Sequence, residues 1–228
     1  MKIRFSDSPP ANVRLYARIL NQGDMPSDLD AALVDGANAA RFKGSAGQVF
    51  ETFAMQDDGL RWIALAGAGE TDATGRRLNI EKAGAALAAK YLLSGESDMV
   101  LDLGHADLSG VEAAAALFGL RLRSWRLDTY RTKLPADKRP SLETIHVVGA
   151  PEGTNEAWTE AEAIARGVEF TRTLVTEPAN KLYPESFVAL CEKAFEGTGA
   201  ELIVLDDDAM EKLGMGALLG VGQGSERP

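Results

Sequence analysis

Short apolar runs alternate with helical patterns through the first 150 of the 228 residues, and this alternation constrains the fold more than any other feature. The runs are rich in Val, Ile, Leu or Phe and are bounded by Gly, Asp or Pro, as strands typically are. They are Lys2–Ser6, Val13–Leu20, Gln48–Met55, Arg61–Ala66, Met99–Leu103 and Thr144–Val148. Strands that alternate with helices predict an α/β layer fold with a largely parallel or mixed sheet.

Two of the helices expected between these strands have distinct compositions. In Arg76–Leu93, apolar side chains recur at steps of three and four, which is one face of a helix. Gly84 and Ala88 lie beside that stripe and would permit close approach to a sheet. Leu108–Leu120 is predicted to be a second helix, rich in alanine.

A long helix is expected to join two domains. It follows a turn at Gly149–Gly153, and Pro178 must end it. A helix of about twenty residues spans about 30 Å, which is enough to connect domains. We therefore divide the chain into an N-terminal α/β domain (1–150), a linker helix (151–175) and the start of a second α/β domain (176–228).

The last 53 residues contain the elements that open an α/β domain. Pro184 suits the first position of a helix, where its missing amide hydrogen costs nothing. Glu201–Leu205 follows as a predicted strand, and Asp206–Asp208 are expected to cap a short helix ahead of a glycine-rich tail. So few residues cannot bury a full core unaided, so we expect the chain to stop where the second domain begins.

The net charge of −10 is concentrated in the second half, since residues 1–150 carry a net −1 and residues 151–228 a net −9. A nucleic-acid binder should show a basic footprint, so we do not expect a nucleic-acid partner. One basic cluster exists, interleaved with Trp125 and Tyr130: Arg121, Arg123, Arg126, Arg131, Lys133, Lys138 and Arg139. Because Asp128 and Asp137 dilute it, we interpret it as a solvated face, or as one that meets the acidic second half or another subunit.

Several features together predict a cytoplasmic protein with no membrane partner. No stretch approaches the roughly 20 apolar residues that a membrane span needs. The charged and alternating residues after Met1 contain no apolar signal-peptide core. Cys191 is the single cysteine, so it cannot form an internal disulfide, and its place on an apolar helix face suits a buried, inert thiol.

Two glycine clusters are candidates for nucleotide-binding loops. Gly67–Gly75 follows a strand and precedes a helix, which is the right place for a phosphate-binding loop. However, Asp72 stands where a dinucleotide fingerprint requires glycine, and Arg76 stands where a P-loop has lysine. A plain strand–helix turn is therefore favoured. Gly214–Gly224 fails the same test at Leu219, and its glycines are interpreted as sites of tight packing.

The two histidines and the acidic run give little support for a metal site. His105 and His146 are 41 residues apart, and no His-Glu-x-x-His motif occurs. His105 follows a strand and is either a site residue at the carboxyl edge of the sheet or a loop histidine without function. His146 is expected to pack within a strand. The consecutive carboxylates of Asp206–Asp208 do not converge, so we interpret them as helix caps.

The run Thr173–Phe187 resembles the beginning of the catalytic domain of leucyl aminopeptidases, cytosolic two-metal exopeptidases with the pattern Asn-x-Pro-x-Asn-x-Leu-x-Pro-x-x-Phe. Thr176 and Tyr183 depart from the usual Asn and Thr, and the matching residues are Pro178, Asn180, Leu182, Pro184 and Phe187. Met210–Ser225 is similar to the family's helix and loop ahead of the metal site. The first 150 residues resemble the family's N-terminal domain in architecture only, a macro-domain-like α/β sandwich.

The resemblance implies the N-terminal part of a metallopeptidase that removes N-terminal amino acids from peptides. In the full-length enzyme, two divalent ions (zinc, manganese or magnesium) would be held by a lysine and several acidic residues, with a catalytic lysine and arginine nearby. Those motifs begin beyond the equivalent of Pro228. The resemblance therefore assigns no catalytic, cofactor-binding or metal residue to this chain, which we expect to be inactive and metal-free alone.

The resemblance also implies partners: peptide substrates, the remainder of the catalytic domain, and further copies of the chain in a homo-oligomer, which is a hexamer in the family. An alternative stays open. The chain could instead be a macro-domain-like module that binds a nucleotide or ADP-ribose, or an oligomerisation module without catalysis.

Overall fold

The computed structural model describes residues 1–56 and 59–227. The chain forms two compact units, residues 1–169 and 170–228, and the boundary falls inside helix α4 (Thr154–Thr176). Each unit is described separately. The three-part division expected from the sequence (1–150, 151–175 and 176–228) stays a prediction.

In the part of the chain that the structure describes, six strands form one sheet in the order β1-β6-β5-β2-β4-β3. Neighbouring strands run parallel, except that β3 is antiparallel to β4. The strands are β1 (Lys2–Phe5), β2 (Leu15–Leu20), β3 (Val49–Gln56), β4 (Gly59–Gly67), β5 (Asp98–Asp102) and β6 (Thr144–Val148). The predicted α/β fold with a mixed sheet is confirmed, and each strand lies within two residues of its expected range.

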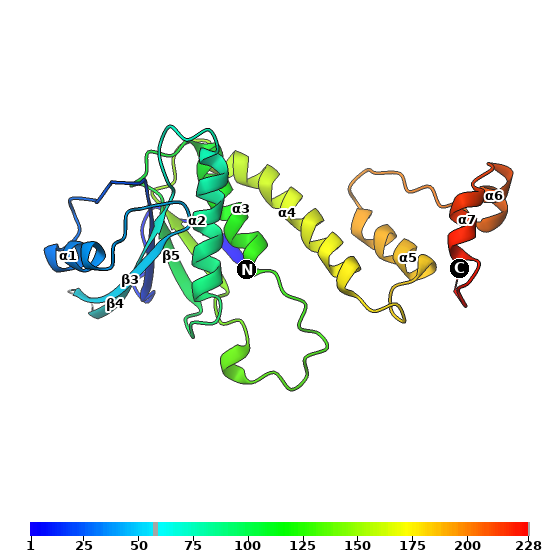
Figure 1. Ribbon diagram of the computed structural model, residues 1–228, viewed down its shortest axis with the longest axis horizontal. Helices are drawn as coiled ribbons and strands as arrows, with labels where there is room; N and C mark the ends of the chain where they lie inside the picture. Colours follow the sequence, from blue (N-terminus) through cyan, green and yellow to red (C-terminus); the bar gives the residue numbers. More distant parts are fainter. Residues whose placement is uncertain (57–58, 228) are drawn as a thin grey trace. The chain divides into compact units, whose positions relative to one another are not determined.

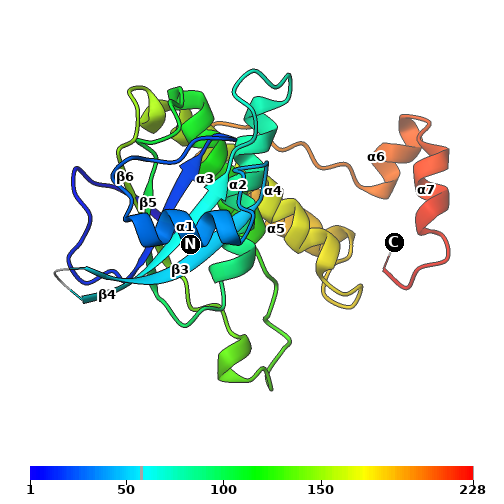
Figure 2. The same cartoon turned by 60° about the vertical axis from the view of Figure 1, so that its left-hand side comes forward.

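Helices cover both faces of the sheet. Figure 1 shows α2 (Arg76–Tyr91) and α3 (Gly110–Ser124) side by side on one face. The main core lies beneath them and includes Leu15, Leu101 and Leu117, together with Trp158 from the first turns of α4. Successive strand residues point to opposite faces. Leu20 and Leu65 therefore face the other way, where they pack against α1 (Ala31–Ala39), seen in front of the sheet in Figure 2.

Helix α1 was not anticipated from the sequence. It is short, and its two buried side chains are Leu33 and Ala37. Asp30 begins it, since its carboxylate accepts a hydrogen bond from the Ala32 amide at 2.7 Å. A helix of nine residues with so narrow an apolar face gives a weak periodic signal.

Two glycines let α2 and α3 cross in direct backbone contact. A Cβ atom placed on Gly84 would lie 1.9 Å from the carbonyl oxygen of Ala116, and one on Gly119 would lie 1.9 Å from that of Glu81. The expectation that Gly84 approaches a sheet is therefore wrong, because its partner is α3. The alanine-rich composition of α3 has the same origin, since small buried side chains keep the two helices close.

A carboxylate on β3 collects three donors at the edge of the core. Glu51 accepts hydrogen bonds from Tyr91 Oη at 2.9 Å and Trp62 Nε1 at 3.1 Å, and pairs with Lys90 Nζ at 2.7 Å. Burial alone would raise the pKa of Glu51, but the bonds from Lys90, Tyr91 and Trp62 outweigh it and hold that pKa below its ordinary value. Burial and the neighbouring carboxylate both raise the pKa of Tyr91, so its hydroxyl stays protonated.

In the described part of residues 170–228, three helices follow α4: α5 (Pro184–Phe195), α6 (Asp207–Lys212) and α7 (Gly216–Gly222). Pro184 stands in the first turn of α5 as expected. Asp206 caps α6 as expected, its carboxylate accepting from the Ala209 amide at 2.8 Å. Helix α7 lies within the segment that was expected to be only a glycine-rich tail.

The prediction of a strand at Glu201–Leu205 is wrong. The segment joins no sheet among the described residues, and Ile203 is 74% exposed. A strand is stabilised by hydrogen bonds to a neighbouring strand, whereas the regular elements described in this unit are helical. The apolar composition of the segment is therefore not matched by burial.

Within residues 1–56 and 59–227, no helix combines the length and apolar character needed to cross a bilayer.

The glycine contact between α2 and α3 predicts an asymmetric response to alanine. Gly84→Ala should lower the free energy of unfolding by about 1–3 kcal/mol, because the new methyl group meets a backbone carbonyl that cannot easily move. Gly167→Ala in α4 is the matched control, since no atom lies within 4 Å of its added Cβ and alanine favours helix by about 1 kcal/mol. Urea unfolding followed by tryptophan fluorescence measures both, because all three Trp lie in residues 1–169. Equal midpoints for the two variants would contradict the contact.

The Glu51 cluster predicts a pH-dependent contribution to stability. A carboxylate with a lowered pKa stabilises the fold above its unfolded pKa of about 4.3 and loses that contribution as the pH falls through its folded pKa. Glu51→Gln should therefore cost about 1 kcal/mol at pH 7 and much less near pH 3. Urea midpoints of both proteins at pH 7, 5 and 3 provide the measurement. A cost that stays constant with pH would show that the charge of Glu51 is not what stabilises the fold.

Candidate functional site

The carboxyl edge of the parallel strands is the natural place to look for a site in residues 1–169. In open α/β sheets, ligands bind in the crevice outside the carboxyl ends of the strands. Three segments meet there, after β2, β4 and β5, and they include the Gly67–Gly75 loop and His105.

The amides that begin the Gly67–Gly75 loop are already used. The N–H groups of Gly67, Ala68 and Gly69 donate to backbone carbonyl oxygens at 2.8–2.9 Å. A Cβ atom on Gly67 would lie 2.3 Å from the carbonyl carbon of Gly44, so another loop crosses directly against it. These three amides are not available to a phosphate group. The interpretation of this segment as a plain strand–helix turn stays a prediction.

Arg76, in the first turn of α2, ties the segments of this edge together. Its guanidinium donates to Asn21 Oδ1 at 2.9 Å, to the carbonyl oxygen of Ala106 at 3.1 Å and to Glu112 Oε1 at 2.9 Å. Arg76 and Asn21 are both largely inaccessible, the latter only 4% exposed. The guanidinium of Arg76 is thus engaged by groups of the protein itself.

Glu112 also has a second structural role, at the start of α3. With Ser109 it forms a capping box at the start of α3, in which each side chain bonds the backbone of the other residue. Burial would raise the pKa of Glu112, but the bonds from Ser109 and Arg76 hold it below its ordinary value. The sequence did not predict that Arg76, Asn21 and Glu112 form a group, although the Ser-x-x-Glu spacing of the capping box is a local signal.

His105 lies in the loop after β5, at the carboxyl edge of the sheet, and takes part in a series of polar contacts. Its Nε2 is 3.0 Å from Asp102 Oδ2, which also lies 3.5 Å from Arg18 Nε. Arg18 pairs in turn with Asp28 at 2.8 Å, and this hydrogen bond lowers the pKa of Asp28. The contacts of Arg18 with Asp28 and Asp102, and of Asp102 with His105, connect the ends of β2 and β5.

His146 lies in β6 and is 9% exposed, in agreement with the packing role predicted for it. Its Nε2 lies 2.8 Å from Asp98 Oδ1 on the neighbouring strand β5. Hydrogen bonds from Ser97 and then His146 lower the pKa of Asp98. The pair joins two adjacent strands of the sheet.

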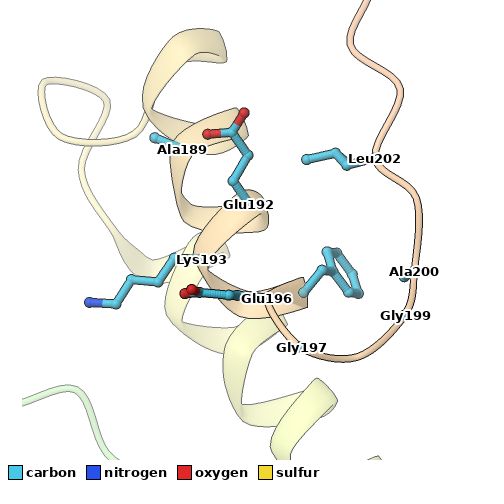
Figure 3. Close-up of a pocket in the computed structure, with 9 residues that line it drawn as sticks. Ala189, Glu192, Lys193, Glu196, Gly197, Gly199, Ala200 and Leu202 are labelled. Carbon is cyan, nitrogen blue, oxygen red and sulfur yellow. The ribbon is translucent and has the colours of Figure 1, made fainter.

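In the described part of residues 170–228, α5 and the segment that follows it form a hollow. Figure 3 shows Leu202 pointing towards α5 from that segment, while Lys193 extends away from it. Glu192 and Glu196 also line the hollow. Cys191 is buried, as its position on the apolar helix face predicted. The polar groups of the hollow diverge instead of converging on a reacting atom.

Among residues 1–56 and 59–227, no three His, Cys, Asp or Glu side chains are grouped so that they could hold an ion. The carboxylates of Asp206–Asp208 do not converge, and that of Asp206 is bonded to the α6 backbone.

The basic cluster divides into two parts. Arg121 is directed to the acidic half of the chain: it donates to Glu169 at 2.8 Å and lies 3.5 Å from Glu162, both on α4. It also donates to the carbonyl oxygen of Met1 at 3.2 Å. The other cations lie further along the chain, most of them in the exposed loop after α3.

A six-stranded mixed sheet with helices on both faces defines residues 1–169 as a layered α/β domain. Residues 17–134 match the N-terminal domain of the cytosol aminopeptidase family, and residues 169–228 match the catalytic domain of the same family. The chain therefore belongs to the cytosol aminopeptidase family, which confirms the resemblance seen in Thr173–Phe187 and Met210–Ser225.

Individual relatives agree with this assignment. A probable cytosol aminopeptidase of Caulobacter vibrioides is 39% identical over 86% of this chain and 39% of its own length. Another, of Gluconobacter oxydans, is 40% identical over 96% of this chain and 44% of its own length. The chain thus spans about two fifths of the length of the curated relatives it matches.

Solved structures share the fold. A tomato leucine aminopeptidase mutant superposes with a TM-score of 0.81 over all of this chain and 49% of its own, at 23% identity. The bottromycin maturation enzyme BotP, in complex with Mn, gives a TM-score of 0.74 over 95% of this chain and 43% of its own, at 24% identity.

The Arg76 network predicts that even a conservative change at this position is costly. Arg76→Lys should lower the free energy of unfolding by about 2 kcal/mol, because a lysine cannot reproduce three divergent hydrogen bonds and leaves Asn21 without its donor. Arg77→Lys, at the exposed neighbouring position, is the control and should change stability by less than about 0.5 kcal/mol. Urea unfolding compares the two. If the variants were equally stable, the network would not be what joins these segments.

Proposed function

We propose that this chain is the N-terminal domain and the beginning of the catalytic domain of a metalloaminopeptidase that removes N-terminal amino acids from peptides. The observation that carries the proposal is the presence of both family domains on one chain, in family order. Relatives named as probable cytosol aminopeptidases match across most of the chain, which supports the same reading.

The metal chemistry of such an enzyme does not fit the residues described here. Divalent ions in a peptidase polarise the scissile carbonyl and activate a water molecule, which requires converging ligands. The described side chains present no such group. We therefore propose no catalytic role for the residues of this chain. We propose that the two ions (zinc, manganese or magnesium) are bound by catalytic-domain residues outside this chain, in keeping with its share of the relatives' length.

The role proposed for residues 170–228 is to form part of a larger core. Apolar side chains lie on their surface, and Val175, Ile203 and Val221 are each at least 74% exposed. Large apolar side chains with this degree of exposure are suited to being covered by another part of the protein. We propose that the remainder of the catalytic domain covers these residues.

Three further properties are part of the proposal. Peptides are the substrates, copies of the chain assemble into a homo-oligomer, and the protein is cytoplasmic. A nucleic-acid partner is not proposed, since the net charge is −10.

The peptidase proposal predicts a clear difference between two proteins. The 228-residue chain should show no turnover of leucine anilide with added manganese, because the proposed ligands lie outside it. The same chain extended with the remaining catalytic domain of the Caulobacter vibrioides relative should bind manganese and hydrolyse the substrate. Release of aniline and metal content after dialysis provide the readouts.

The control for this experiment is the catalytic-domain extension expressed alone. Manganese-dependent turnover by residues 1–228 would refute the placement of the ligands. Lack of activity in a folded, metal-loaded extended protein would refute the aminopeptidase function.

A further inference from the structure

A long loop connects α3 to β6. It runs from Trp125 to Glu143 and contains the short 3-10 helix η1 (Ala136–Lys138). Connections in α/β units usually have about two to six residues, and ordered loops much longer than that are commonly functional. Figures 1 and 2 both show this loop extending away from the sheet and from α2 and α3. The loop is therefore longer than a connection of this kind usually is, and it projects from the domain.

The loop is held in shape by its own hydrogen bonds. The guanidinium of Arg126 and the carboxylate of Asp128 pair through two bonds, Nε to Oδ2 at 2.7 Å and Nη2 to Oδ1 at 3.3 Å. The Arg131 amide donates to the carbonyl oxygen of Asp128 at 2.9 Å. Arg139 Nε donates to the carbonyl oxygen of Leu134 at 3.1 Å. Because these bonds already fix its shape, the loop loses less conformational entropy when a partner binds.

This loop concentrates positive charge in an acidic protein. Residues 126–139, which we call the cationic loop, contain five cations and two carboxylates, whereas the whole chain carries a net −10. The side chains of Arg131 and Lys138 are 62% and 63% exposed, and Lys133 between them is also exposed. A projecting surface whose charge is opposite to that of the rest of the protein is suited to meet an anionic partner.

The loop fits an acidic polypeptide better than other anions. The Arg126–Asp128 pair shows that its guanidinium groups can take a carboxylate through two parallel bonds. Asp137, whose side chain is 73% exposed, needs a hydrogen-bond donor, which a polypeptide has in its N–H groups and a phosphate backbone lacks. The net −10 of the chain also repels a densely charged polyanion. Tyr130, 52% exposed, is of a residue type enriched at protein interfaces.

We propose that the cationic loop is a docking site for an acidic segment of a partner protein. Carboxylates of that segment pair with Arg131, Lys133 and Lys138, and the segment packs against Tyr130. Each exposed ion pair contributes at most about 1 kcal/mol, so binding depends on several contacts acting together. The docking site is independent of the proposed peptidase function.

Contacts between exposed charges are screened by salt. The Debye length falls from about 30 Å at 0.01 M to about 10 Å at 0.1 M ionic strength. The affinity of the loop for an acidic peptide should therefore drop at least about tenfold over that range. Binding through apolar contacts would not weaken in this way, so a salt series identifies the source of the affinity.

Fluorescence anisotropy on the full chain tests the docking site with defined probes. The first probe is a labelled peptide of six Glu-Ser repeats, and the matched probe has six Gln-Ser repeats. At 0.01 M ionic strength, the wild type should bind the Glu peptide at least about tenfold more tightly than the Gln peptide. Lys133→Glu/Lys138→Glu should weaken binding of the Glu peptide at least about tenfold, because the attracting charges are reversed. Lys133→Gln/Lys138→Gln, which only removes them, should give an intermediate affinity.

Arg77→Glu/Lys82→Glu on α2 is the matched control, since two exposed cations are reversed there with the same change in net charge. It should bind the Glu peptide at least about threefold more tightly than the Glu variant of the loop. Urea midpoints verify that every variant is folded. A wild type that does not bind the Glu peptide would overturn the docking site, and so would an equal loss of affinity in the loop and α2 variants.

Other occupants of the loop would give different results. A single-stranded oligothymidylate, or vesicles containing phosphatidylserine, could bind the wild type more tightly than the Glu peptide does. If that binding were lost in the loop variants, the loop would belong to the polyanion and the proposal would be wrong. Self-association of the wild type that is lost in the loop variants would assign the loop to a second copy instead. The peptidase assay is independent of all these outcomes.

Discussion

The close crossing of α2 and α3 is the constraint on which the rest of the α/β domain depends. Gly84 and Gly119 each place a backbone carbonyl of the other helix where a side chain would otherwise be. The first turns of the two helices are then near enough for Arg76 to reach Glu112. The same guanidinium bonds Asn21 and Ala106, so the helix crossing also determines the loops that follow β2 and β5. A contact between two glycines and two carbonyls thus organises one whole edge of the sheet.

The polar groups described at that edge bond one another. The amides of Gly67, Ala68 and Gly69 are bonded to carbonyls, and Arg76 bonds Asn21, Ala106 and Glu112. Neither feature favours the nucleotide or ADP-ribose alternative. Family membership points instead to a scaffold that precedes the catalytic domain, and the exposed apolar residues of 170–228 agree with that order.

The sequence was most informative where the pattern is local. The cap at Asp206 and the Pro184 helix were predictable because each depends on neighbouring residues. The six strands were predictable because their apolar runs, bounded by turn residues, coincide with segments that also have a strand to pair with. Glu201–Leu205 failed as a strand because strand formation depends on a partner, which composition does not report. The hydrogen bonds of Arg76 and the pairing of His146 with Asp98 join residues more than 25 positions apart, so no spacing rule could reveal them.

Arg121 has a practical meaning for anyone dissecting this protein. Arg121 forms an ion pair with Glu169, the last residue of the first compact unit, and Trp158 is buried in the core of the sheet domain. A fragment that ends at residue 150 would lack both Trp158 and Glu169. The core would then contain an apolar cavity, and the guanidinium of Arg121 would have lost its ion-pair partner. The smallest fragment that folds independently should therefore include α4 as far as Glu169. Most of this helix, which the sequence suggested was a linker, is part of the N-terminal domain.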